Sequence, residues 1–142
     1  MDCTYQTALE AMEKGDIGDA LECCEAARQN GSFDSDLLFL EAQLKMKLGK
    51  LEEAAQLLDD ILDSDPEHLN ALTNKGVLEG MRENYDSALE CFRTLKKLQP
   101  DNDFVIYNLA VTMIRMGEAE KALDLLGEIE DGGMDESGMV SL

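Results

Sequence analysis

The feature that most constrains the fold of this chain is a repeat of 34 residues. Sliding the sequence by that length places Pro66 on Pro100 and brings four alanines into register: Ala20, Ala54, Ala88 and Ala122. Such a period is typical of architectures built by stacking one small structural unit. We expect one domain over residues 1–136, made of four repeats and followed by a flexible tail at residues 137–142. The repeats run over residues 1–34, 35–68, 69–102 and 103–136.

Each repeat reads as two amphipathic helices joined by a tight turn. In the first repeat, apolar or small residues recur at helical spacing over Met1–Lys14 and Ile17–Gln29, with Gly15 between the two stretches. In the third repeat, Glu83 stands where the others have this glycine, so we expect a softer end to that helix. The second helix of the last repeat is expected to end at Glu130, followed by a frayed segment rich in glycine and acids.

Two antiparallel helices are too small to bury their own apolar faces, so neighbouring repeats must supply the contacts. We therefore predict an all-α stack of helix pairs. Small residues should mark the close approaches of helices within it; besides the four aligned alanines, they are Ala8, Ala42, Gly76 and Ala110. Larger residues should fill the space between repeats: Cys24, Leu58, Phe92 and Leu126.

The charge of the chain excludes some partners. The formal net charge is -19, which repels a phosphate backbone, so nucleic acid is not an expected ligand. The acidity either attracts a basic partner or only keeps the surface solvated, and charge alone does not separate these two readings. No apolar run is long enough to cross a membrane, and the first residues do not resemble a secretory signal. We expect a cytoplasmic protein.

Neither a metal site nor an active site is predicted. The four cysteines lack CxxC spacing, and the single histidine, His68, falls in a predicted loop. We expect four reduced thiols, with Cys24 in the core. The acidic residues around Pro66 lack the glycine and the final glutamate of an EF-hand, so they are read as helix-end residues. No nucleophile with a nearby base and no phosphate-binding loop is present, so we expect neither a cofactor nor enzymatic activity.

The repeat length, the small residues, the turn glycines and the closing prolines together resemble the tetratricopeptide repeat family. The resemblance covers nearly the whole chain. It departs from the family at the place where a tyrosine is usual, which here holds Ala11, Lys45, Glu79 and Met113. The resemblance implies a right-handed superhelical solenoid of helix-turn-helix repeats, in which the first helix of each pair lines a concave groove that holds a peptide or a helix of another protein.

Counting into the first helices gives the residues that the resemblance places in this groove. They are Tyr5, Leu9, Met12, Phe39, Leu40, Gln43, Met46, Asn70, Asn74, Val77, Met81, Phe104, Tyr107, Asn108, Val111 and Ile114. Aromatic and methionine side chains of this kind suit an apolar or amphipathic segment. The alternative is that the rings pack against neighbouring repeats.

Some family members grip a chaperone's C-terminal carboxylate with a clamp of basic residues and asparagines. The basic places of the clamp hold Tyr5, Phe39 and Phe104 here, so the clamp is absent. Asn74 and Asn108 match its asparagines, and they either bond to a ligand's backbone or face solvent.

The function expected from these features is protein binding. The chain would act as an adaptor or a co-chaperone-like scaffold whose groove holds an apolar or basic-amphipathic segment. The alternative is a self-assembling homodimer, because no capping helix is predicted after Glu130 and apolar groups of the last repeat would lie open: Val111, Ile114, Leu125 and Ile129. A third reading, a fragment of a longer array, fits the same observation.

Overall fold

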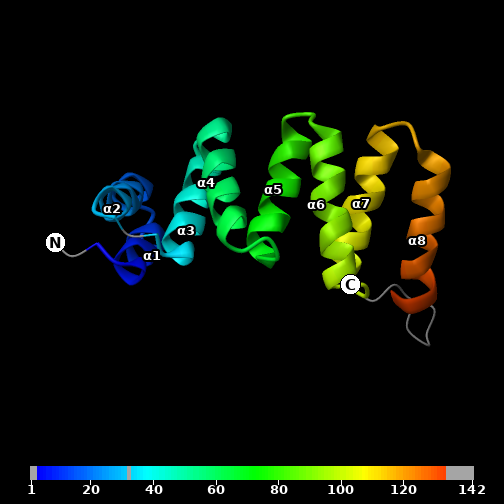
Figure 1. The fold of residues 1–142 in the computed structure, drawn as a ribbon, viewed down its shortest axis with the longest axis horizontal. Coiled ribbons are helices and arrows are strands. Elements are labelled where there is room, and N and C mark those ends of the chain that lie inside the picture. Colours follow the sequence, from blue (N-terminus) through cyan, green and yellow to red (C-terminus); the bar gives the residue numbers. More distant parts are fainter. Residues whose placement is uncertain (1–2, 32, 134–142) are drawn as a thin grey trace. The chain divides into compact units, whose positions relative to one another are not determined.

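The computed structural model describes residues 3–31 and 33–133 (Figure 1). Eight α-helices and no strand lie in these residues, and the helices follow the predicted pairs. They are α1 (Tyr5–Glu13), α2 (Ile17–Gln29), α3 (Ser35–Lys47), α4 (Leu51–Ser64), α5 (Leu69–Met81), α6 (Tyr85–Leu98), α7 (Asp103–Arg115) and α8 (Ala119–Gly133). The expected tail at residues 137–142 lies outside the described residues.

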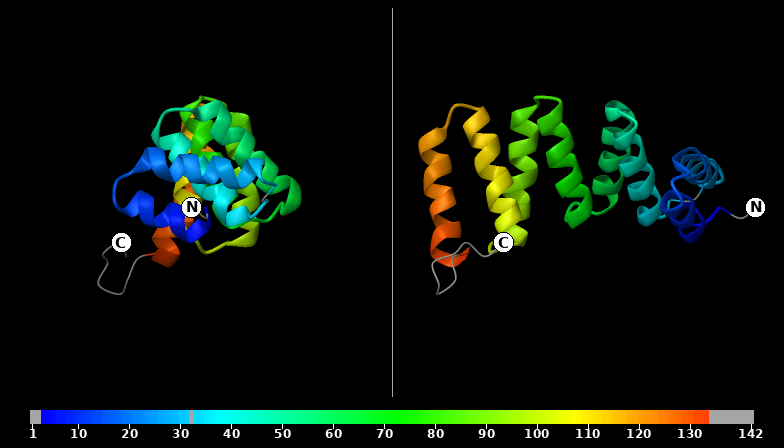
Figure 2. Two further views of the ribbon diagram at one scale, coloured as in Figure 1. Left: turned by 90° about the vertical axis from the view of Figure 1, so that its left-hand side faces the viewer. Right: turned by 180° about the vertical axis from the view of Figure 1, so that it is seen from behind.

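The chain forms two compact units, Met1–Asn74 and Lys75–Leu142, called here the N-terminal and the C-terminal unit. In the N-terminal unit, α1 packs against α2, α3 packs against α4, and α2 lies against α3. In the C-terminal unit, α6 lies against α7, and α7 and α8 form an antiparallel pair, seen from behind in Figure 2. The boundary between the units falls inside α5.

Alanines occupy the predicted points of close approach between helices. Ala8, Ala20 and Ala42 are completely buried, as are four others at equivalent places: Ala54, Ala88, Ala110 and Ala122. Three of the larger predicted core residues are also buried: Cys24, Leu58 and Phe92. Leu126 is only half-buried, because no described helix follows α8 to cover it.

Polar side chains fix the starts of several helices. The Thr4 hydroxyl accepts a hydrogen bond from the Thr7 N–H (3.2 Å), which starts α1 at Tyr5 and not at the predicted Met1. At α3 the cap is Asp34, whose side chain accepts a hydrogen bond from the Asp36 N–H (2.9 Å). At α5 the cap is His68, whose Nδ1 accepts from the Ala71 N–H at 3.0 Å.

The end of α8 also differs from the prediction. The helix continues three residues beyond Glu130, to Gly133. Glycine weakens a helix through its conformational entropy, but it keeps its backbone N–H and so does not by itself end one.

The turn at Glu83 is as tight as the turns at the glycines, contrary to the expectation of a softer helix end. Glu83 adopts a positive φ of 63°, close to the 76° of Gly49. The Asn84 N–H donates to the Glu79 carbonyl at 2.8 Å, the same distance as the Lys50 to Lys45 bond after Gly49. The closing hydrogen bond therefore holds a non-glycine residue in a left-handed conformation.

Replacing Glu83 with glycine is expected to raise the free energy of unfolding by about 0.5–1 kcal/mol. Relief of the left-handed conformation outweighs the extra entropy that glycine adds to the unfolded chain. Urea denaturation followed by circular dichroism measures the change. The matched control is Gly117→Glu, which places the same side chain at a φ of 85° and should lower stability. A Glu83→Gly variant less stable than wild type would contradict this account.

Candidate functional site: a pocket between α5, α6 and α7

The predicted groove residues of the N-terminal unit differ in exposure. Tyr5 is 37% exposed, whereas Phe39 is half-buried and its ring lies 6.1 Å from the ring of His68, centroid to centroid. Leu40 is 2% exposed and belongs to the core that joins α1, α2 and α3, so it offers no surface to a ligand. The other predicted residues here are half-buried, apart from the exposed Asn70: Leu9, Met12, Gln43, Met46 and Asn74.

The predicted residues of the C-terminal unit are more open. Four large apolar side chains are more than half exposed: Met81, Phe104, Tyr107 and Ile114. Val77, Asn108 and Val111 are half-buried. Exposed apolar side chains on a water-soluble surface point to an interaction surface when they gather in one place.

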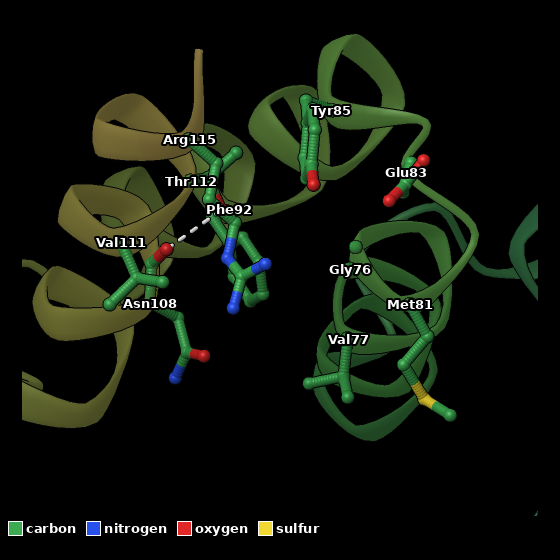
Figure 3. A pocket seen from close by; sticks show the side chains of 11 residues that line it. Gly76, Val77, Met81, Glu83, Tyr85, Phe92, Asn108, Val111, Thr112 and Arg115 are labelled. Carbon is green, nitrogen blue, oxygen red and sulfur yellow. Dashed lines mark hydrogen bonds between the residues drawn. The ribbon is translucent and has the colours of Figure 1, made fainter. Parts of the chain in front are cut away.

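A pocket of about 280 Å³ brings four of these residues together. Val77 and Met81 line it from α5, and Asn108 and Val111 line it from α7 (Figure 3). The sequence did not single out the other lining residues as site residues: Gly76, Gly80, Glu83, Tyr85, Phe92, Thr112 and Arg115. The pocket thus has apolar side chains from α5 and one from α7, polar side chains beside them on α7, and a floor that includes the Phe92 ring of α6.

Two glycines one helical turn apart shape the pocket: Gly76 lets the Phe92 ring approach α5, and Gly80 leaves open space. A Cβ atom built on Gly76 would lie 2.7 Å from Cζ of Phe92, so any side chain there would collide with the buried ring. A Cβ built on Gly80 would meet nothing within 4 Å, so that glycine opens space beside the pocket. The spacing of Gly76 and Gly80 was the one sequence signal that could have indicated this hollow.

Polar groups converge on the same space. The Asn108 amide donates through Nδ2 to the Phe104 carbonyl (2.8 Å), which orients its Oδ1, and Oδ1 has no protein donor among the described residues. The Thr112 hydroxyl donates to the Asn108 carbonyl, also at 2.8 Å. Figure 3 shows the side chains of Arg115 and Asn108 reaching into the space between α5 and α7. The guanidinium of Arg115 forms no ion pair with the described residues, so it is open to a ligand's acceptor.

The residues that line the pocket carry no net charge. Its charged residues are Glu83 and Arg115, and the repeat of residues 69–102 carries five acidic and five basic residues in an otherwise acidic chain. The arrangement therefore suits an apolar side chain whose flanking backbone offers a carbonyl to Arg115 and an N–H to Asn108 Oδ1.

A buried ion network lies in the N-terminal unit. Glu41 of α3 is completely buried and accepts two hydrogen bonds from Arg28 of α2, at 3.0 and 2.9 Å. Nζ of Lys45 lies 3.1 Å from Glu41 and 3.3 Å from Glu53 of α4. The network joins α2, α3 and α4 at one of the places where the resembling family has a tyrosine.

The cations of this network keep their charge. The pKa of Arg28 is raised, mainly because its guanidinium donates hydrogen bonds to Glu41. Desolvation alone would lower the pKa of Lys45, but the hydrogen bonds and charges of Glu41 and Glu53 outweigh it and raise the pKa. A raised pKa means that the folded state holds the proton more tightly than the unfolded state. The stabilisation is therefore fully present below the ordinary lysine pKa of 10.5 and is lost as the pH rises above it.

All four cysteines are thiols, and Cys24 is in the core as expected. Burial raises the pKa of Cys24 to about 12 and that of Cys23 to about 11, so both stay protonated and weakly nucleophilic near neutral pH. Among residues 3–31 and 33–133, no group of three His, Cys, Asp or Glu side chains is placed to hold a metal ion. None of the described helices has the length and apolar character that a membrane span requires.

Comparison with known proteins identifies the class. Residues 39–103 match the tetratricopeptide repeat family model. Two of the similar solved structures are MamA AMB-1, with a TM-score of 0.82 at 19% identity over 92% of this chain and 73% of that one, and a tetratricopeptide repeat protein from Parabacteroides merdae. The latter has a TM-score of 0.83 at 21% identity, covering 89% of this chain and 51% of that one. Residues 39–103 therefore match the tetratricopeptide repeat family, the chain has an all-α solenoid fold, and the resemblance seen in its sequence is confirmed.

Its curated relatives are longer proteins. An uncharacterized protein of Sinorhizobium fredii, y4yS, is 29% identical over 64% of this chain and 49% of its own length. Mouse N-alpha-acetyltransferase 16, NatA auxiliary subunit, is 26% identical over 82% of this chain and 14% of its own length. The chain thus spans less than half of these relatives. The tetratricopeptide repeat fold is that of a protein-interaction scaffold.

Proposed function

We propose that the chain is an adaptor that binds an extended or helical segment of a partner protein, with an apolar side chain of that segment in the pocket between α5, α6 and α7. The observation that carries the proposal is the pocket itself, in which Val77, Met81 and Val111 surround a hollow with an unpaired cation and an open amide oxygen. Pockets that combine apolar walls with a few placed polar groups bind one side chain in a fixed orientation.

The rest of the predicted groove extends this surface. Phe104, Tyr107 and Ile114 are exposed on α7 and supply apolar contact area beyond the pocket. The acidic surface of the other repeats favours Lys or Arg at the edges of the bound segment. An auxiliary subunit or a co-chaperone-like scaffold is the kind of role that such a surface serves.

Selection from a random peptide library on the immobilised protein tests the proposal. The enriched peptides are expected to share one large apolar residue. Fluorescence anisotropy should show at least roughly tenfold weaker binding to Met81→Asp or Val111→Asp, because each change puts a charge against the apolar anchor. Both residues are at least partly exposed, so the folded state should tolerate the substitutions.

The matched control is Leu123→Asp. Leu123 is 67% exposed on α8 and does not line the pocket, so this variant should bind the peptides as wild type does. Equal losses in all three variants would contradict the proposal. If light scattering shows a dimer that Leu123→Asp dissociates, the homodimer becomes the better account, since α7 and α8 expose Ile114 and Leu123.

A further inference from the structure

A second surface lies on α1 and α2, on the side that faces away from α3. No described helix covers this side, whereas the corresponding sides of α3 and α7 are covered by the helix before them. The first helices of two later repeats, α3 and α7, bury three positions at four-residue spacing. In α3 these are Leu37, Glu41 and Lys45, and α2 lies against that helix; in α7 they are Val105, Leu109 and Met113, and α6 lies against that helix. The equivalent positions of the first repeat are Cys3, just before α1, and Thr7 and Ala11 in α1; all three are only half-buried.

A cavity of about 500 Å³ marks this uncovered face. Its floor is formed by small, uncharged residues of α1, of α2 and of the segment before α1, among them Cys3, Ala11, Cys23 and Ala26. The corresponding face of α3 is covered by α2. The basic residue Arg28 of α2 donates hydrogen bonds to Glu41 of α3.

The rim of the cavity is strongly acidic. Glu10, Asp16, Asp19 and Glu22 line it, against the single cation Lys14. All five residues are exposed. A ligand that fills the cavity must therefore present an apolar or small-residue stripe to the floor and positive charge to both edges.

We propose that the face of α1 and α2 docks an amphipathic helix of a partner protein, with lysine or arginine on both sides of an apolar stripe, in the position that α2 takes on α3. This surface is separate from the pocket of the C-terminal unit and needs no groove residue. A second copy of the chain is the poorer occupant, because each copy carries a net charge of -19 and would bring acidic side chains to an acidic rim.

The probe is a synthetic peptide of about 20 residues, long enough to form a helix, with leucine and alanine on one face and lysine along both edges. A second peptide carries glutamate in place of every lysine. Fluorescence anisotropy at low salt should show saturable binding of the lysine peptide and none of the glutamate peptide.

Variants of the rim and floor separate this site from general attraction to an acidic protein. Glu10→Lys with Glu22→Lys should weaken binding roughly tenfold. The control double variant Asp63→Lys with Glu67→Lys makes the same change in net charge at exposed positions outside the cavity and should have a much smaller effect. Ala11→Phe should also abolish binding, by filling the cavity, while leaving the charge unchanged.

Cys3 gives a readout of where the probe sits. It is the one half-buried cysteine; Cys23, Cys24 and Cys91 are buried, so N-ethylmaleimide should label Cys3 first. The lysine peptide should slow that labelling at least several-fold, and Met81→Asp should leave the protection intact.

Two results would overturn the proposal and leave the function proposed for the pocket of the C-terminal unit unaffected. One is labelling of Cys3 that the lysine peptide does not slow, and the other is an equal loss of binding in the two double charge variants. A dimer that Ala11→Phe dissociates would overturn it in favour of a second copy.

Discussion

Replacing Glu41 with alanine is expected to lower the free energy of unfolding by about 3–5 kcal/mol. Glu41 is completely buried and holds both Arg28 and Lys45, and Lys45 itself is only 5% exposed. Removal of the carboxylate leaves the lysine charge buried with only the exposed Glu53 nearby. An uncompensated buried charge costs far more than the ion pair contributed. Urea denaturation followed by circular dichroism measures the loss.

The double variant Glu41→Leu with Lys45→Met separates charge from packing. It removes both buried charges and keeps apolar volume at the two sites, so its stability should stay within about 1 kcal/mol of wild type or exceed it. If the double variant loses as much as Glu41→Ala, the helices depend on the ion pairs themselves, and the explanation by an uncompensated charge is wrong.

Replacing Gly76 with alanine is expected to lower the free energy of unfolding by about 1–3 kcal/mol, although alanine is the better helix former. The new Cβ would lie 2.7 Å from the Phe92 ring, and that ring is 2% exposed, so it cannot move aside without disturbing its neighbours. Thermal and urea denaturation measure the effect. The same substitution should also alter the pocket, whose floor includes that ring.

Gly80 supplies the matched control for this prediction. It lies in the same helix one turn later, and a Cβ there would meet nothing within 4 Å, so Gly80→Ala should raise stability by about 0.5–1 kcal/mol. Combining Gly76→Ala with Phe92→Leu should give a loss smaller than the sum of the two single changes, because the smaller side chain relieves the collision. If the loss in the double variant equals the sum of the two single losses, the collision with the Phe92 ring is not the cause of the instability of Gly76→Ala.

The 34-residue period was sufficient to predict the helix pairs. Helical spacing and small residues at fixed places depend on local sequence and on contacts that every repeat shares, so Ala20 and Ala54 could be assigned to buried positions from the alignment alone. The turns followed from glycines at Gly15 and Gly49, each with a positive φ. The same regularity led to the wrong expectation at Glu83, where the hydrogen bonds of the turn hold a residue that local preference disfavours.

The candidate site could be predicted only in part. Counting along the first helices identified Val77, Met81, Asn108 and Val111 of the pocket, but it also placed Leu40 in the groove. Leu40 follows Phe39 directly in the helix, so its side chain points about 100° away and lies in the core. The contributions of Phe92 and Arg115 were missed, because side chains from α6 and from the end of α7 reach the pocket through the packing of three helices.

The sequence by itself thus determined the class of fold, the pairing of the helices and the small residues at the helix contacts, since these depend on periodicity. The tertiary structure alone decided which charges are buried and which surfaces are hollow. Glu41 meets Arg28 across 13 positions of the chain, and Gly76 meets Phe92 across the helix pair. Such contacts depend on how helices rotate and approach one another, and that packing is cooperative, so no single stretch of sequence specifies it.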